Sequence, residues 1–279
     1  MPPSRTTAPH PPHPRKPGSP SRGTASPSRR PRLLALAVIG AAAILTAGVL
    51  VHEFTGAGDD APRALNATEA QQLALARFGA YESGTLGVHV TLPGSGRDDG
   101  TDVHGIVDYR AHRAVGRYTT GRPESRDGGL LAWDTGGLAV AQVPEKKGQR
   151  PAAQAAALDP GTWSQRAYTT DPLDAALRLV IAMGTDRPDN PQLLAQAGPR
   201  RLGRASIDGT DYTLYSGPRP RDSAKGGRSP LTYWVDDKGR LGRLEARIAS
   251  LPGPARVDFT PNRDADKVPG RPWERVGGK

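Results

Sequence analysis

The alternation of apolar and polar positions divides most of the chain into strands and a few helices. In Thr85–Leu92 every second residue from Leu86 onward is apolar, a period of two that predicts a half-buried strand. In the segment 172–184 the apolar residues recur at helical spacing instead. Asp171 can cap that helix, Pro172 suits its first position and Gly184 follows its end. Both kinds of element are therefore expected in one domain.

Short turns join most of the expected strands. Asp208-Gly209, for example, is a strong signal for a hairpin. Sequential hairpins imply an antiparallel sheet, and the helices are available to cover its apolar face. The predicted fold class is α+β: a large curved antiparallel sheet, or half-open barrel, with helices on its concave face. Further strands are expected over 103–110, 113–120, 130–134, 138–143, 202–207, 210–215, 231–235, 240–249 and 256–260, and further helices over 68–81 (with Thr68 as the start of a capping box) and 191–197, whereas 144–170 reads as a loop.

A different pattern precedes this domain. From Leu33 to Val51 the chain has 19 residues without a charge. As a helix with a rise of about 1.5 Å per residue, this run reaches about 28 Å, close to the hydrocarbon thickness of a bilayer. Arg29, Arg30 and Arg32 stand before the run, and basic residues stay on the cytoplasmic side. The sequence predicts one transmembrane helix with the N-terminus inside, so the membrane itself is the expected partner. The C-terminal domain is expected to be extracytoplasmic, at the cell membrane.

Two other interpretations of the apolar run stay open. A signal peptide could be cleaved near Thr55-Gly56-Ala57, although the run is longer than the usual core of about 7–15 residues. A twin-arginine signal could centre on Arg29-Arg30, although Arg32 stands where that motif favours an apolar residue. All three interpretations place the following domain beyond the cytoplasmic membrane.

Charge and composition exclude several function classes. The net charge of +10 is concentrated at the N-terminus, because residues 1–51 hold seven basic side chains and no acid, whereas the rest holds 31 basic and 28 acidic groups. A nearly neutral body gives no reason to expect a nucleic-acid partner. The chain has no cysteine, which excludes disulfides, thiol catalysis and lipid attachment through an N-terminal Cys.

The expected organisation follows from these patterns. About 200 residues are enough for one domain with a substantial core. The predicted parts are a disordered Pro/Arg-rich cytoplasmic tail (1–32), the transmembrane helix (33–51), a spacer (52–64), the extracytoplasmic α+β domain (65–262) and a flexible C-terminal tail (263–279).

Two segments carry a resemblance to a known family. The first is VHGIVDY at 103–109 leading into AVGRY at 114–118, and the second is YWVDDKGRLGRL at 233–244, a strand, turn and strand. With the order of elements, they resemble the LolA/LppX-like lipoprotein-carrier superfamily. The resemblance implies a half-open barrel with a helical lid that binds or senses acyl chains or lipoproteins. Many members are lipidated on a Cys, which this chain lacks, so a tethered binder or sensor is expected rather than a shuttle.

Motifs for catalysis and cofactors are missing from the sequence. It contains no G-x-x-x-x-G-K-[ST], no G-x-S-x-G and no H-E-x-x-H. We therefore predict no catalytic residue, no cofactor and no enzymatic activity. An unrecognised hydrolase stays an alternative hypothesis, and it would require a Ser/His/Asp set that clusters only in space.

One group of residues could form a metal site across adjacent strands. His89, Asp102 and His104 would make a two-His, one-carboxylate set. They occupy polar positions of alternating strands, however, and show no metal-ligand spacing along the chain. Solvated side chains explain them, and the sequence predicts no metal site.

The remaining candidate site is the apolar face of the sheet with the helices above it. If a gap separates them, the domain binds or senses a lipid, an acyl chain or a lipoprotein. If the same residues pack together, the domain is a protein-interaction or regulatory module with a filled core, an envelope protein as its partner and no small ligand. The expected lining comprises Leu86, Val88, Val90, Val107, Tyr109, Tyr118, Leu177, Ile181, Leu214, Tyr233 and Val235.

Overall fold

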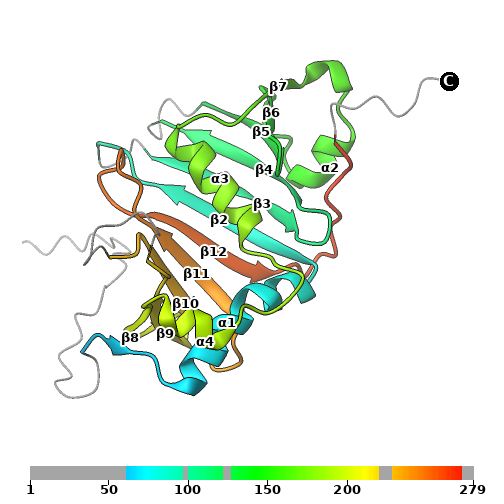
Figure 1. Ribbon diagram of the computed structural model, residues 1–279. Coiled ribbons are helices and arrows are strands. Elements are labelled where there is room, and N and C mark those ends of the chain that lie inside the picture. The colour runs from blue at the N-terminus through cyan, green and yellow to red at the C-terminus, as the bar shows by residue number, and fades with distance from the viewer. Residues whose placement is uncertain (1–60, 97–99, 122–126, 220–227, 272–279) are drawn as a thin grey trace, which may run out of the picture. The chain divides into compact units, whose positions relative to one another are not determined.

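The computed structural model describes residues 61–96, 100–121, 127–219 and 228–271 (Figure 1). All of them belong to one compact unit, residues 54–279. The expected tail at 1–32, the expected membrane helix at 33–51 and most of the expected spacer lie outside the described residues. Within the described ranges, no helix combines the length and the apolar character needed to cross a membrane.

Twelve strands and four α-helices make up the described part of the domain. The strands are β1 (Arg63–Ala64), β2 (Thr85–Leu92), β3 (Thr101–Asp108), β4 (Arg113–Thr120), β5 (Asp127–Asp134), β6 (Leu138–Ala141), β7 (Ser164–Arg166), β8 (Arg200–Ile207), β9 (Thr210–Ser216), β10 (Leu231–Val235), β11 (Leu241–Ala246) and β12 (Ala255–Pro261). The helices are α1 (Ala67–Glu82), α2 (Pro151–Ala156), α3 (Pro172–Ala182) and α4 (Pro191–Gln196), with a 3₁₀ turn, η2, at Pro160–Thr162.

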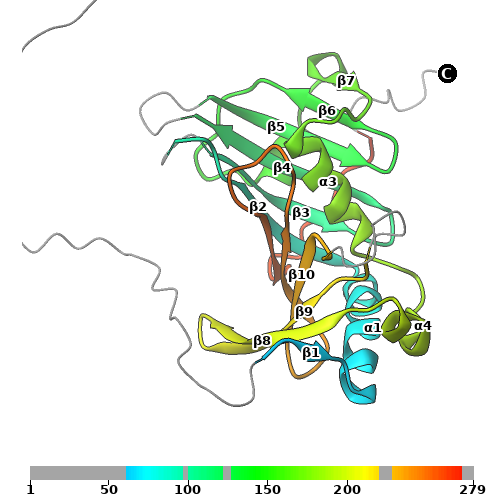
Figure 2. The ribbon, with the colours of Figure 1, turned by 60° about the vertical axis from the view of Figure 1, so that its left-hand side comes forward.

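All twelve strands belong to one sheet in the order β1-β8-β9-β10-β11-β12-β2-β3-β4-β5-β6-β7, and every neighbouring pair is antiparallel. Strands that follow one another in the chain build each half: β2 to β7 form one, and β8 to β12, with β1 beside β8, form the other. The last strand joins the halves, since β12 pairs with β2 and places Phe259 opposite Val88. The sheet bends between these halves and stays unclosed, with β1 and β7 at its two ends (Figures 1 and 2). The predicted α+β fold with a large curved antiparallel sheet is confirmed.

Helices cover both faces of the sheet. We call the face that carries α1 and α3 the concave face and the other one the convex face (Figure 1). Alternation along β2 and β3 puts Val90, Val103 and Val107 on the concave face, where they are fully buried. On the convex face, α2 packs over β3 and β4. The expectation that the helices share the concave face therefore holds for α1, α3 and α4 but not for α2.

The segment 144–170, which was expected to be a loop, contributes helices and side chains to a second apolar cluster on the convex face. α2 begins at Pro151 and η2 at Pro160, so prolines that look like breakers occupy the first positions of helical turns. Proline is tolerated there because its missing N–H has no helical partner anyway. Trp163 follows and is 7% exposed. It belongs to an apolar cluster with Val115, Leu130, Ala132, Ala139, Ala141, Ala152, Ala155 and Val268.

Contacts of the domain also extend past the expected boundary at residue 262. Val268 is 5% exposed and lies in the convex-face cluster. Arg271 Nε donates to Asp134 Oδ2 over 2.8 Å. On the N-terminal side, Arg63 and Ala64 pair with β8 as strand β1. The packed domain thus includes the described residues from 63 to 271.

Asn66, not Thr68, caps α1. Its Oδ1 accepts from the backbone N–H of Glu69 over 2.9 Å, and Glu69 Oε2 accepts from the backbone N–H of Asn66 over 3.0 Å. This is a reciprocal capping box shifted by two residues from the predicted one.

We expect Asn66→Ala to lower the free energy of unfolding by about 1 kcal/mol, and Thr68→Ala to change it by less than about 0.5 kcal/mol. Urea unfolding of both variants checks this, and equal losses would contradict the assignment.

Candidate functional site

Most of the residues predicted to line a ligand site form a packed core instead. Leu86 and Tyr118 pack against this core and are partly buried. The concave face under α3 is therefore filled by the protein's own side chains. Those exposed by 7% or less are Val88, Val90, Val107, Tyr109, Leu177, Ile181, Tyr233 and Val235.

Leu214 is the one predicted lining residue on the wrong face. It pairs with Trp234 across β9 and β10. Trp234 follows Tyr233 in the strand and so points to the convex face, because consecutive side chains alternate. The concave position belongs to Tyr215, which is fully buried and donates its hydroxyl to Gln72 Oε1 of α1 over 3.0 Å. Large residues stand on both faces of β9, with Tyr212 and Leu214 on one and Tyr215 on the other, so the sequence left it ambiguous which face is buried.

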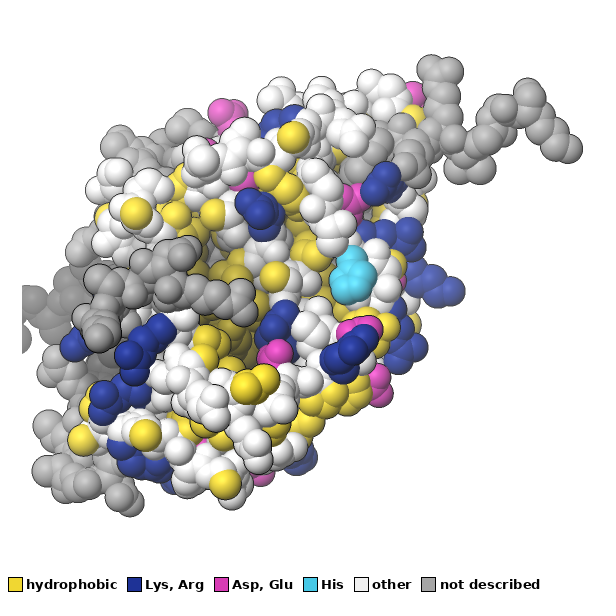
Figure 3. Space-filling model, in the orientation of Figure 1, with side chains coloured by type: hydrophobic (Ala, Val, Ile, Leu, Met, Phe, Trp, Pro, Cys, Tyr) yellow, Lys and Arg dark blue, Asp and Glu magenta, His cyan; other side chains and the backbone are white. Residues whose placement is uncertain are grey.

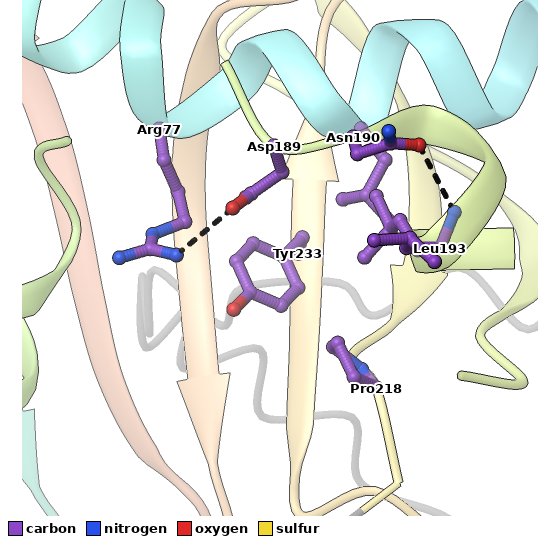
Figure 4. A pocket seen from close by; sticks show the side chains of 8 residues that line it. Arg77, Asp189, Asn190, Leu193, Pro218 and Tyr233 are labelled. Atoms are coloured by element: carbon purple, nitrogen blue, oxygen red, sulfur yellow. Dashed lines mark hydrogen bonds and ion pairs between the residues drawn. The ribbon is translucent and has the colours of Figure 1, made fainter. Parts of the chain in front are cut away.

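A pocket of about 300 Å³ lies beyond this packed region, between α1, α4 and β10 (Figure 4). This volume is at the lower end of the range typical of small-molecule sites. On the face that carries α1, α3 and α4, hydrophobic side chains form the floor of a hollow (Figure 3). Tyr233 is the predicted residue that lines the pocket. The lining residues are Leu73, Arg77, Asp189, Asn190, Leu193, Leu194, Pro218 and Tyr233.

Two helices position the apolar part of the pocket. Leu73 and Arg77 are four residues apart on α1 and so share one side of that helix. The start of α4 is fixed by Asn190, whose Oδ1 accepts from the backbone N–H groups of Gln192 (2.9 Å) and Leu193 (3.1 Å). This cap holds Leu193 at the edge of the pocket.

A paired charge forms the polar part of the pocket. Arg77 Nη1 lies 3.5 Å from Asp189 Oδ1. The same guanidinium donates through Nε (3.2 Å) and Nη2 (2.9 Å) to the carbonyl oxygen of Ala182, the last residue of α3. The backbone N–H of Asp189 donates to Ala74 O over 3.1 Å. Arg77 thereby ties α1 to α3 and to the loop before α4, and its charge is balanced within the pocket.

Exposure distinguishes the two sides of this site. Leu193 is 64% exposed, which is unusual for a large apolar side chain in the described part of the domain. Tyr233 is only 6% exposed, and its ring lies beneath Asp189 with Arg77 to one side (Figure 4). Burial raises the pKa of Tyr233, so its phenol stays neutral at physiological pH. The pocket is therefore apolar, with an uncharged hydroxyl and one neutralised ion pair.

Sequence reasoning missed the residues of this pocket other than Tyr233. Leu193-Leu194 after the Asn190-Pro191 cap was a usable signal, because a six-residue helix cannot bury both side chains against one neighbour. Arg77 and Asp189 are 112 residues apart, and nothing local in the sequence links them.

The strand register brings together His89, Asp102 and His104 on the convex face. His89 Nε2 lies 3.0 Å from Asp102 Oδ1 and 3.3 Å from Thr91 Oγ1. One ring nitrogen thus meets both the carboxylate and the hydroxyl. A nucleophile relay uses separate ring nitrogens for these two partners. The cluster therefore lacks the arrangement that the hydrolase hypothesis requires.

Comparison with known proteins finds similarity only among solved structures. No family model matches the chain, and no curated protein sequence matches it. LprF from Mycobacterium bovis is 18% identical with a TM-score of 0.40, and the match covers 73% of this chain and 97% of that one. The lipoprotein LppX from Mycobacterium tuberculosis is 18% identical with a TM-score of 0.38, covering 68% and 93%.

A third match is more distant. A DUF1329 family protein from Desulfovibrio piger is 11% identical with a TM-score of 0.24, and the match covers 70% of this chain and 91% of that one. LppX, which the sequence resemblance named, is thus among the solved structures to which the chain is similar.

Proposed function

We propose that the domain binds an apolar, chain-like ligand such as a fatty acyl group in the pocket between α1, α4 and β10. The observation that carries this proposal is an apolar pocket whose edge holds the exposed Leu193. Apolar surface in water costs roughly 25 cal/mol per Å², so a ligand that covers Leu193 and Leu194 is stabilised by that contact. The balanced Arg77–Asp189 pair adds polarity without a net charge.

The proposal includes a membrane anchor. The uncharged run 33–51, preceded by arginines, supports a transmembrane helix with its N-terminus in the cytoplasm. A domain tethered in this way stays beside the bilayer, which is a source of acyl chains. Binding or sensing at the outer surface of the membrane, rather than transport through solution, then follows as the function.

Photo-crosslinking of a fatty acid tests both parts of the proposal. The full chain is reconstituted into liposomes that contain a diazirine-labelled palmitic acid, floated on a density gradient, irradiated and mapped by peptide mass spectrometry. We expect the chain to float with the liposomes. We also expect label on the peptides that contain Leu193, Leu194 and Tyr233, in addition to label in the membrane run.

Leu193→Lys is expected to reduce pocket labelling at least five-fold, because the ammonium group keeps its water and blocks the edge of the pocket. Gln192→Lys is the matched control: it adds the same charge on the same helix, at an exposed residue that does not line the pocket. Pocket labelling that is equal in both variants, or labelling spread evenly over the exposed surface, would refute the ligand site.

The filled core under α3 favours a second candidate, an extracytoplasmic interaction module. Val90, Val107 and Leu177 leave no solvent access on that part of the concave face. In this case the label is confined to residues 33–51, and the pocket peptides stay unlabelled in the wild-type chain. The exposed Leu193 would then belong to a protein contact.

A further inference from the structure

Three potential metal ligands converge on the convex face, away from the pocket. In the register of β2 and β3, His89 stands opposite His104, and Thr91 stands opposite Asp102. The imidazole rings stack with centroids 3.8 Å apart and planes 16° from parallel. A hairpin register, and not spacing along the chain, creates this juxtaposition.

The ligand atoms are close enough to share one ion. One imidazole nitrogen from each histidine and one carboxylate oxygen of Asp102 all lie within 4.8 Å of one another. His89 Nε2 and Asp102 Oδ1 are 3.0 Å apart. Zinc binds imidazole nitrogen at about 2.0–2.1 Å and carboxylate oxygen at about 2.0–2.2 Å, so ligands around it lie about 3–3.5 Å apart. One imidazole ring therefore has to tilt about its Cβ–Cγ bond for all three atoms to reach one ion.

Accessibility allows both that tilt and the entry of an ion. The side chains of His89 and Asp102 are 37% and 30% exposed, and His104 is an exposed residue.

Three charged residues on neighbouring strands stand beside the cluster. Two of them have other partners, and the third, Arg256 of β12, stands opposite Thr91. Arg117 stands opposite His104 across β3 and β4, but its guanidinium donates to Gln154 Oε1 of α2 over 2.6 Å and to Val143 O over 3.2 Å. Asp258, opposite His89 on β12, is paired with Arg243. Neither Arg117 nor Arg243 is therefore aimed at the cluster, where a cation would oppose a metal ion.

A neighbouring hydroxyl orients the carboxylate. Thr91 Oγ1 donates to Asp102 Oδ1 over 3.3 Å. Groups that hold a ligand in place in this way accompany protein metal sites and raise their affinity. The cluster thus has ligands from two adjacent strands and a support for one of them.

We propose that His89, Asp102 and His104 bind one divalent transition-metal ion, with Zn²⁺ as the best fit. Two imidazoles and one carboxylate are the ligand types that Zn²⁺ takes, and three protein ligands leave a fourth position open to water or to an anion. The bound ion joins β2 to β3 on the convex face. This site is independent of the apolar pocket.

Zinc titration of the full chain in detergent tests the proposal. His10, His13 and His52 are replaced by Gln in every sample, so that the N-terminal histidines do not contribute. Competition with a chromogenic zinc chelator is expected to show one tightly bound Zn²⁺ per chain. Cobalt bound in its place should give the visible absorption of a low-coordinate site. Absence of a tight site in this background would overturn the proposal.

Variants locate the ion. His89→Gln with His104→Gln is expected to abolish tight binding, and Asp102→Asn to weaken it at least ten-fold. The matched control is His112→Asn, at an exposed turn residue with φ of 49°, a conformation that asparagine tolerates. Urea unfolding verifies that each variant is folded. Zinc affinity and cobalt absorption that survive in the folded double variant would also overturn the proposal.

Discussion

Arg166→Met is expected to lower the free energy of unfolding at pH 7 by about 3 kcal/mol. Asp174 of α3 is fully buried, and Arg166 Nη1 and Nη2 donate to its two oxygens over 2.5 and 2.8 Å. Thr169 donates through its backbone N–H (2.7 Å) and its hydroxyl (2.8 Å). These two bonds remain in the variant, but they do not neutralise the charge. The loss arises from a buried carboxylate without its counter-ion.

The pH dependence of this loss is a second measurement. Burial raises the pKa of Asp174, but hydrogen bonds from Arg166 and Thr169 outweigh it, so its pKa lies below the ordinary value. The stability from the ion pair is therefore present above the unfolded pKa of about 3.9 and is lost as the pH falls through the folded pKa. Wild type and variant should differ most at neutral pH, and the difference should shrink as the pH falls through the lowered folded pKa of Asp174.

Urea unfolding followed by tryptophan fluorescence at several pH values gives both quantities. Arg178→Met is the matched control on α3, because Arg178 is exposed and only overlies the ring of Tyr168 at 5.7 Å. Its loss should stay below about 1 kcal/mol at every pH. Equal losses in the two variants, or a loss for Arg166→Met that does not change with pH, would contradict a role of the buried pair in holding α3.

Leu177→Ala is expected to cost about 3 kcal/mol of unfolding free energy. Leu177 lies in the middle of α3 and is fully buried in the concave-face core. Its truncation removes apolar contacts and leaves a cavity that the surrounding sheet cannot close.

Leu179→Ala is the control on the same helix, since Leu179 is only partly buried, and about 1 kcal/mol is expected for it. Urea midpoints with unchanged slopes give the two values. A loss below about 1 kcal/mol for Leu177→Ala would mean that α3 is loosely seated and that the concave face can open. With that outcome, the lipid site that the sequence predicted under α3 would again be a candidate.

Local patterns predicted the elements whose signals are themselves local. The strands at 85–92, 113–120 and 231–235 have the predicted bounds, because alternation and turn residues are both clear there. The start of α3 was also correct: Asp171 accepts from the backbone N–H of Leu173 over 2.8 Å, and Pro172 opens the helix. Each of these features depends on residues within one or two turns of chain.

Features set by distant contacts could not be read in this way. The pairing of β12 with β2 and of β1 with β8 joins segments far apart in sequence. The pocket depends on Arg77 reaching residues more than 100 positions away. A packed core and a ligand-sized gap also require the same apolar residues, so the pattern of the concave face alone could not distinguish them.

The cluster of His89, Asp102 and His104 also depends on contacts between strands, which spacing along the chain does not reveal. The sequence already suggested that His89, Asp102 and His104 could meet across adjacent strands, but no metal-ligand spacing along the chain supported a site, since His89 and Asp102 are 13 positions apart. The distance that matters is across the hairpin, where the register makes His89 and His104 direct neighbours. Only the pairing of β2 with β3 places the three side chains together.

The short strands at the two ends of the open sheet affect whether copies of the domain associate with one another. β1 has two residues and β7 has three, and each includes an arginine. Long, flat outer strands recruit other chains through their free amide and carbonyl groups, whereas short charged ones offer too few of them. Copies of the domain that lie side by side should therefore stay separate, even though the sheet is not closed into a barrel. Fibril-like assembly through the outer strands is disfavoured.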